Sequence, residues 1–152
     1  MADAQSARSA GVLRRFGAML YDTLIVVALA MLLTMALLPL TGGQAILSER
    51  VGAYEYLYRG LLVLLVIIFF GAFWTRRGQT LGMVAWRLKV ERDDGTSLRW
   101  SDTLLRLAGA SVSLLAFGLG YFWIWIDRDR LAWHDRWSHT RVIVLPKRSA
   151  MN

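Results

Sequence analysis

The stretch FGAMLYDTLIVVALAMLLTMALLP, residues 16–39, decides the fold class of this chain. Asp22 is its only charged residue, and Leu, Val, Ile, Ala and Met make up most of the remainder. A helix needs about 20 apolar residues to cross the hydrocarbon core of a bilayer. We therefore expect a transmembrane helix over residues 16–39. A cleaved signal peptide is the competing interpretation, because arginines precede the run, but the run is too long for one and carries a carboxylate early.

A second apolar stretch covers residues 57–74 and has LLVLLVIIFF at its centre. It predicts a second transmembrane helix. The apolar segment 104–126 carries no charge after Arg106, but it contains several glycines and serines. We therefore expect this third segment to be broken rather than straight.

The composition agrees with a membrane protein. The chain has 152 residues, of which 56% are hydrophobic, above the 45–50% that is usual for soluble proteins. It contains no cysteine, which excludes a disulfide framework, thiolate metal sites and a cysteine nucleophile. The expected fold class is an all-α membrane protein with a small cytoplasmic β-hairpin.

The net charge of +7 would suggest nucleic acid as a partner of a soluble protein. Here the basic residues flank the apolar runs, where anionic lipid headgroups explain them. We therefore expect membrane lipids as partners and no nucleic acid.

Basic residues also predict the orientation in the membrane. Lys and Arg are frequent before residue 16 and in the loop 75–103, and rare between the first two apolar runs. By the positive-inside rule, the N-terminus and the loop face the cytoplasm of a bacterial cell, with the protein in the inner membrane. The tail, residues 127–146, is basic too, and a third full crossing would place it outside. Either the tail breaks the rule, or the third segment is a re-entrant hairpin bent around residues 117–120, which we favour.

Short strand patterns bear on this choice. Residues 88–91 alternate between apolar and charged, a turn signal follows, and residues 96–100 could form the return strand of a hairpin. Residues 140–145 are another strand candidate. If these strands share one sheet, the tail lies on the same side as the loop. We expect one membrane domain over residues 11–146, with residues 1–10 and 147–152 disordered.

Asp22 is the residue that most needs an explanation. An ionisable group within a transmembrane helix costs on the order of 2.5–3.5 kcal/mol and normally needs a partner or a cavity. Arg15 lies two helical turns earlier on nearly the same face, and Arg106 and Arg59 are the other candidate partners. Asp22 is then either one partner of a structural ion pair or a carboxylate that binds a cation or a proton on a transport path. The remaining alternative is that its side chain reaches the membrane interface and has no role.

No pattern in the chain predicts catalysis. The two histidines, His134 and His139, lack metal-ligand spacing, although His134 could relay protons. Gly78 and Gly82 frame Thr80 in GQTLG, which we interpret as a turn into a short interfacial helix. We expect no catalytic residue, no metal and no cofactor.

Three of these segments, in this order, resemble the RDD family of small bacterial membrane proteins, named for one arginine and two aspartates. The resemblance covers residues 12–145. In RRFGAMLYD (residues 14–22), Arg15 and Asp22 match the arginine and the first aspartate of the family. GQTLG and Arg106, which come later in the chain, resemble the middle part of the family pattern. In RLAWHDR (residues 130–136), with TRV after it, Asp135 matches the second aspartate. Other residues in these segments match the family pattern, namely Gly78, Thr80, Gly82, Arg130, His134 and Thr140. Met83 departs from it, because many members have a lysine there.

The resemblance implies a function only in outline. It suggests transport of an unidentified ligand, with Asp22 as the ion-coupling carboxylate and Arg15 controlling its charge state or access to it. Asp135, with Arg106 or Arg130, would lock the cytoplasmic end. Transport would require a homo-oligomer, because two or three helices cannot easily enclose a path. The alternative is a membrane scaffold or assembly factor in which the arginines and aspartates are structural locks.

Overall fold

The computed structural model describes residues 9–41 and 53–146. Most of the residues that we expected to be disordered, 1–8 and 147–152, lie outside this range. Ser9 and Ala10 do not fit that prediction. Ser9 forms a bridge with Ile143, and the Ala10 N–H donates to the Val142 carbonyl at 2.9 Å. The ordered chain therefore begins before residue 11.

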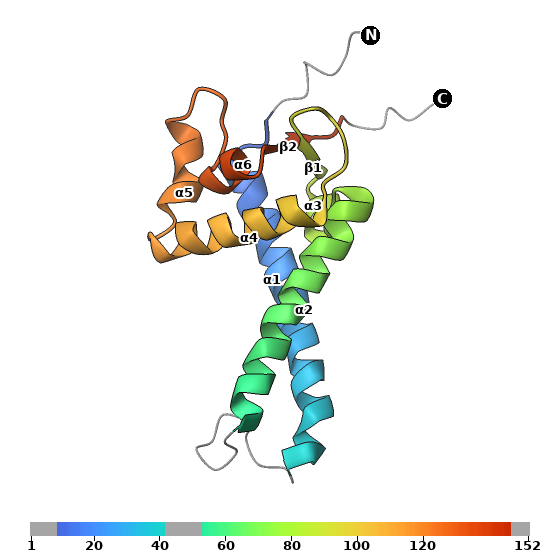
Figure 1. Cartoon of the computed structure of the whole chain (residues 1–152). Helices are drawn as coiled ribbons and strands as arrows, with labels where there is room; N and C mark the ends of the chain where they lie inside the picture. Colours follow the sequence, from blue (N-terminus) through green and yellow to red (C-terminus); the bar gives the residue numbers. More distant parts are fainter. Residues whose placement is uncertain (1–8, 42–52, 147–152) are drawn as a thin grey trace, which may run out of the picture.

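Two long helices dominate the molecule (Figure 1). Helix α1 spans Val12–Leu37 and continues as a 3₁₀ turn over Leu38–Thr41, and helix α2 spans Ala53–Arg77. Both are long and apolar enough to cross a membrane. Each begins four residues before the predicted start, because the first turn of a helix also accommodates polar residues that lie outside the apolar run.

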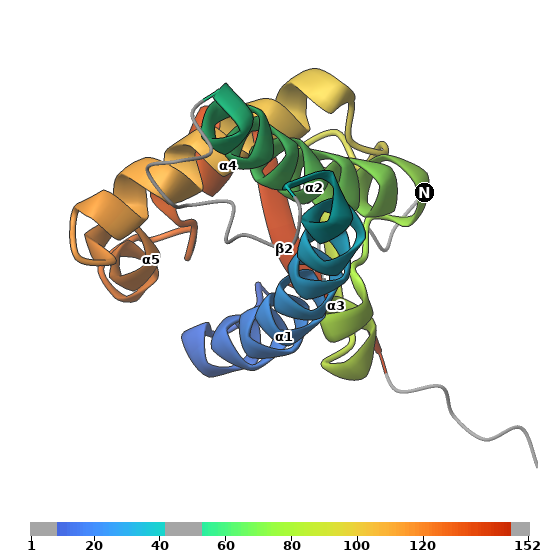
Figure 2. The same ribbon diagram turned by 90° about the horizontal axis from the view of Figure 1, so that it is seen from below.

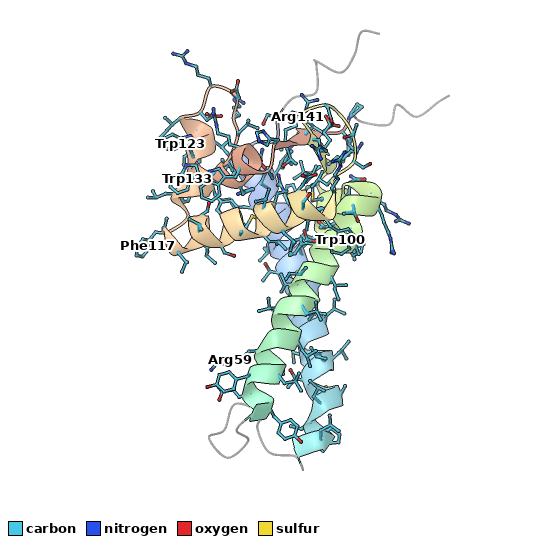
Figure 3. The ribbon with its side chains drawn as sticks, viewed as in Figure 1. Arg59, Trp100, Phe117, Trp123, Trp133 and Arg141 are labelled. Atoms are coloured by element: carbon cyan, nitrogen blue, oxygen red, sulfur yellow. The ribbon has the colours of Figure 1, made fainter. Side chains whose placement is uncertain are left out.

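The third apolar segment is broken, as predicted. Helix α4 spans Trp100–Leu115, helix α5 spans Leu119–Phe122, and a 3₁₀ turn, Trp123–Trp125, follows. The chain bends by 108° between these two parts. Phe117 and Gly118 have positive φ at the bend, and the Phe117 side chain projects from it, 94% exposed (Figure 3). Helix α4 lies across α1 and α2 rather than beside them (Figures 1 and 2).

A two-stranded antiparallel sheet is present, but one predicted strand is wrong. Strand β1, Leu88–Arg92, pairs with β2, Thr140–Val144, with Val90 opposite Val142. Residues 96–99 form no strand, because the Asp94 carboxylate accepts hydrogen bonds from the N–H and the hydroxyl of Thr96. This Asx turn directs the chain into α4.

Two short helices complete the fold. Helix α3, Leu81–Ala85, connects α2 to β1, and helix α6, Trp133–Trp137, precedes β2. Thr80 caps α3 by accepting the Met83 N–H at 3.2 Å. The Asp135 carboxylate caps α6 by accepting the Ala132 N–H at 3.1 Å.

The pairing of β1 with β2 fixes the course of the bent segment. β1 precedes α4 and β2 follows α5, so the chain leaves the sheet and returns to it at one end of the molecule. The start of α1 and the end of α2 lie at the same end (Figure 1). The hydrophobic core is here too, and its members are Ala10, Ala18, Trp74, Met83, Leu88, Val90, Leu98 and Val142.

The opposite parts of α1 and α2, residues 24–37 and 54–68, form a helical stalk (Figure 1). The Thr34 hydroxyl and the Tyr58 hydroxyl share a hydrogen bond of 2.7 Å within it. About half of its apolar side chains are exposed, Leu24 and Met31 at 63% each, and none is fully buried. Such a surface is stable in lipid or against another chain.

Candidate functional site

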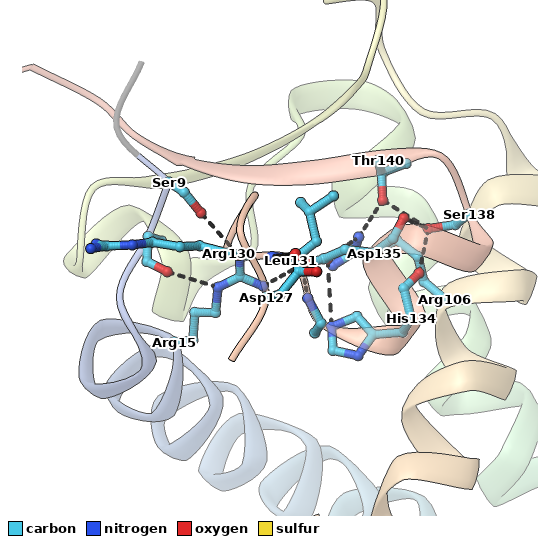
Figure 4. Close-up of polar contacts among 12 residues, drawn as sticks. Ser9, Arg15, Arg106, Asp127, Arg130, Leu131, His134, Asp135, Ser138 and Thr140 are labelled. Atoms are coloured by element: carbon cyan, nitrogen blue, oxygen red, sulfur yellow. Dashed lines mark hydrogen bonds and ion pairs between the residues drawn. The ribbon is translucent and has the colours of Figure 1, made fainter. Parts of the chain in front are cut away.

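Arg15 and Asp135, which the sequence resemblance matched to the RDD arginine and second aspartate, meet in a buried cluster at the sheet end of the molecule. Asp135 is fully buried in the first turn of α6. Its Oδ2 accepts Nη1 of Arg15 from α1 at 2.5 Å, and its Oδ1 accepts Nη1 of Arg106 from α4 at 2.7 Å (Figure 4). We call these three residues the arginine–aspartate cluster. It joins elements that are 120 residues apart in sequence.

Further hydrogen bonds complete the cluster. Arg106 Nη1 also donates to the Thr140 hydroxyl, and Arg15 Nε donates to the Ala10 carbonyl at 3.1 Å. Burial by itself raises the pKa of Asp135, but the charges of Arg15 and Arg106 outweigh it and hold the pKa well below its usual value. Asp135 is therefore ionised at neutral pH, which suits a permanent lock.

His134 lies beside the cluster. Its Nε2 is 3.6 Å from Asp135 Oδ1, and its ring packs on Tyr121 of α5 with the ring centroids 4.9 Å apart. Burial lowers the pKa of His134 to about 4, and the nearby arginines contribute, against the opposing charge of Asp135. The imidazole is therefore neutral at pH 7. A proton relay through His134 stays a prediction.

Asp22 has no arginine partner in the described residues, which corrects the predicted ion pair. Its Oδ2 accepts the Thr80 hydroxyl at 2.5 Å, and its Oδ1 accepts the Gly82 N–H at 2.9 Å. The three candidate arginines are engaged elsewhere. Arg15 and Arg106 bind Asp135, and Arg59 pairs with Glu55 one turn away on α2.

The glycines of GQTLG position this contact. A Cβ atom at Gly82 would lie 2.2 Å from the Ala18 carbonyl oxygen, so only glycine lets α3 pack this closely on α1. Gly78 has a φ of +66° and ends α2 by donating its N–H to the Trp74 carbonyl at 3.0 Å. The predicted turn and short helix are therefore present, and their role is to place Thr80 and Gly82 against Asp22.

Arg130 does not belong to the cluster, although it was one candidate lock for Asp135. Its side chain is exposed, and its backbone carbonyl accepts the Ser9 hydroxyl at 3.1 Å. The lock uses Arg15 and Arg106 instead, because α1 and α4 bring these two arginines to Asp135 inside the protein. His139, the other histidine, is also exposed.

A partly open cavity of about 190 Å³ lies between the cluster and the long helices. Its lining includes Arg15, Met19 and Asp22 of α1, Trp74 of α2, and Arg106 and Ala110 of α4. Trp74 is the residue that sequence reasoning missed: its ring lies under the Arg106 guanidinium, 5.1 Å from Cζ. Its position at the end of an apolar run gave only a membrane-boundary signal. In residues 9–41 and 53–146, no group of three or more His, Cys, Asp or Glu residues could hold a metal ion.

Comparisons with known proteins identify the family of this chain. The sequence model described as the RDD family matches residues 9–139, a range that contains Arg15, Asp22, Arg106 and Asp135. Neither the curated proteins nor the solved structures gave a significant match. Because the match covers most of the chain and its apolar helices are long enough to span a bilayer, this protein is a membrane protein of the RDD family.

Proposed function

We propose that this protein transports a small solute or a cation across the bacterial inner membrane in exchange for, or together with, protons, and that Asp22 is the group that exchanges the proton. One observation carries the proposal. The Asp22 carboxylate lines a partly open cavity and pairs with no arginine of residues 9–41 and 53–146, whereas Asp135 pairs with two. A carboxylate without a permanent counter-ion is free to take up a proton or a cation. No covalent chemistry is required of the protein.

Charge supports a cytoplasmic position for the sheet end. The end of α2 and the start of β1 contribute Arg76, Arg77, Arg87 and Lys89 there, all within the loop that positive-inside counting assigns to the cytoplasm. Because α4 and α5 return to the sheet, the segment after them would be cytoplasmic as well. These basic residues would face anionic lipid headgroups.

The stalk supports a homo-oligomer. Two helices cannot enclose a polar path, and about half of the apolar side chains of the stalk are exposed in a single chain. A ring or pair of stalks would complete a path that continues from the cavity. Cross-linking in native lipid should therefore capture multimers, and a protein that stays monomeric there contradicts this part of the proposal.

Flux measurements test the role of Asp22. The purified protein is reconstituted into vesicles that contain a pH-sensitive dye, and gradients of sodium, potassium, lithium and inorganic phosphate are imposed in turn. We expect at least one gradient to drive a protein-dependent pH change that Asp22→Asn reduces at least tenfold. Asp93→Asn, a change at an exposed aspartate, is the matched control and should keep the wild-type rate.

Two outcomes contradict the proposal. One is a vesicle pH that does not respond to any of the four gradients beyond protein-free controls. The other is a response that Asp22→Asn leaves intact in well-folded protein.

A scaffold is the second candidate function, and the arginine–aspartate cluster favours it. This fully buried cluster joins α1, α4 and α6 as a structural lock would. On this alternative Asp22 only holds α3 against α1. Asp22→Asn should then reduce the amount of folded protein in membranes and leave the vesicle pH assay silent for both proteins.

A further inference from the structure

Four buried nitrogen atoms, all in residues that line the cavity, have no hydrogen-bond partner among the described residues. Nη2 of Arg15, Nε1 of Trp74, Nε of Arg106 and Nδ1 of His134 are buried and have no partner among the described residues. All four residues line the cavity, and each is at least nine-tenths buried. Three of the four atoms are N–H donors in every protonation state that the protein reaches. Buried donors without acceptors are rare in folded proteins, which indicates that something supplies acceptor atoms here.

The charge of the cluster specifies the acceptor. Arg15 and Arg106 share one carboxylate, that of Asp135, so these three residues together carry one positive charge, which the Asp22 carboxylate in the same lining offsets only when it is ionised. Guanidinium and indole N–H groups bind the oxygens of carboxylates and phosphates well, and ionised acceptors make the stronger hydrogen bonds. A ligand whose polar group is a carboxylate or a phosphate therefore fits this end of the cavity.

The remainder of the cavity is apolar. Met19 of α1, Phe70 of α2, and Leu107 and Ala110 of α4 line it on the side of the long helices, opposite the sheet. Met19 lines the cavity and is 37% exposed, and α1, to which it belongs, is long and apolar enough to lie in a bilayer. A fully water-soluble anion would leave these side chains without a partner, whereas a hydrocarbon chain would cover them.

We infer that the cavity binds an anionic amphiphile from the membrane, an acyl chain that ends in a carboxylate or a phosphate. The head accepts hydrogen bonds from Arg15, Arg106 and Trp74, and the chain passes the apolar residues of α1, α2 and α4 into the bilayer. This assignment deepens the proposed function, because it names the class of solute that would be transported. Only the transport of the amphiphile rests on the proposed function. Binding itself does not depend on it.

Equilibrium binding tests the inference. The full chain is purified in an uncharged detergent, and bound radioactive oleate is counted by scintillation proximity. Unlabelled dodecyl phosphate, dodecylamine, acetate and inorganic phosphate are the competitors. We expect dodecyl phosphate to displace oleate, and dodecylamine, acetate and inorganic phosphate to fail at concentrations a hundredfold higher.

Three variants locate the site. Ala110→Trp fills the cavity and should weaken oleate binding at least tenfold. Ala108→Trp places the same ring on the exposed face of α4 and should leave binding unchanged. Trp74→Phe keeps an aromatic ring, although a smaller one, and removes the indole N–H, and it should weaken oleate binding about three- to tenfold. Size-exclusion profiles identical to wild type establish that the variants are folded.

Each contrary result has a distinct meaning. Displacement by acetate or inorganic phosphate at oleate-like concentrations overturns the acyl chain, and displacement by dodecylamine overturns the anionic head. The assignment of the site is overturned if the protein does not bind oleate, or if Ala108→Trp weakens oleate binding as much as Ala110→Trp does. Oleate binding by a protein that moves no ion or solute in vesicles supports the site and contradicts transport. Proton-coupled flux without oleate binding supports transport and contradicts the assigned solute class.

Discussion

Asp22 and Asp135 are both aspartates of the family motif, but their surroundings differ. Asp135 receives two guanidinium groups and is a permanent anion, whereas Asp22 receives one hydroxyl and one backbone N–H. A buried carboxylate between two arginines costs much to disrupt. Removal of Asp135 leaves two buried guanidinium groups without their counter-ion, and removal of either arginine leaves one carboxylate oxygen without its donor. These contacts support the proposed division between Asp135 as a structural aspartate and Asp22 as an exchanging one.

The arginines of the cluster should be essential for stability. Arg15→Ala or Arg106→Ala is expected to lower the free energy of unfolding by about 3–5 kcal/mol, because each removes a buried partner of Asp135. The free energy of unfolding is measured by denaturation with SDS in mixed micelles. Arg130→Ala is the matched control, since Arg130 is exposed, and should change the value by less than about 0.5 kcal/mol. Equal losses in all three would mean that the cluster does not hold the helices together.

His134 should make stability depend on pH. Its folded pKa of about 4 is below the ordinary 6.5, so the unfolded chain binds the proton more tightly. The stabilisation is complete above pH 6.5 and is lost as the pH falls from 6.5 toward 4, by at most on the order of 3 kcal/mol. Melting temperatures across this range should fall for the wild type and fall less for His134→Gln. The exposed His139 provides the control, and a His139→Gln protein that loses the same dependence would contradict the assignment to His134.

At the scale of elements, α3 is held to α1 by a close backbone approach. A Cβ at residue 82 would meet the Ala18 carbonyl oxygen at 2.2 Å, so Gly82→Ala must push α3 away and strain both Asp22 hydrogen bonds. We expect a loss of about 1–3 kcal/mol in unfolding free energy, together with reduced flux. Gly60→Ala, where nothing lies within 4 Å, is the matched control and should be neutral or slightly stabilising. Comparable losses in the two variants would remove the argument for close packing at Gly82.

The elements were predictable where a local pattern encodes them, and not otherwise. Two spans and a broken third segment follow from hydropathy and from the glycines near Phe117, because solubility in lipid is a property of each stretch by itself. The sequence did not specify which strand pairs with β1. The turn after β1 favoured a return strand over residues 96–100, and residues 140–145 were another strand candidate. Pairing over such a separation depends on how α4 and α5 return, which no local pattern specifies.

The site was predictable only in its membership. Resemblance to the family identified Arg15, Asp22 and Asp135, and linked Asp135 to Arg106 or Arg130, of which only Arg106 binds it. It could not show that Asp22 binds a backbone N–H, because any residue type can supply one. Trp74 and the unpartnered donors of the cavity also depend on three-dimensional packing.

At the scale of the whole molecule, the return of α4 and α5 to the sheet predicts where the chain emerges. We expect a fluorescent reporter that matures only in the cytoplasm to be active at the C-terminus, and a periplasmic phosphatase to be inactive there. A phosphatase fused after residue 41, beyond α1, is the positive control and should be active. The reverse pattern at the C-terminus would mean that α4 and α5 cross the bilayer.

The most direct measurement compares Asp22→Asn with Asp135→Asn in one preparation, recording both unfolding free energy and vesicle pH change per folded protein. The account predicts that Asp135→Asn loses about 3–5 kcal/mol of stability, while Asp22→Asn stays within about 1–2 kcal/mol of the wild type and loses the pH change. It would be contradicted if Asp22→Asn were as unstable as Asp135→Asn, or if its folded fraction still moved protons at the wild-type rate.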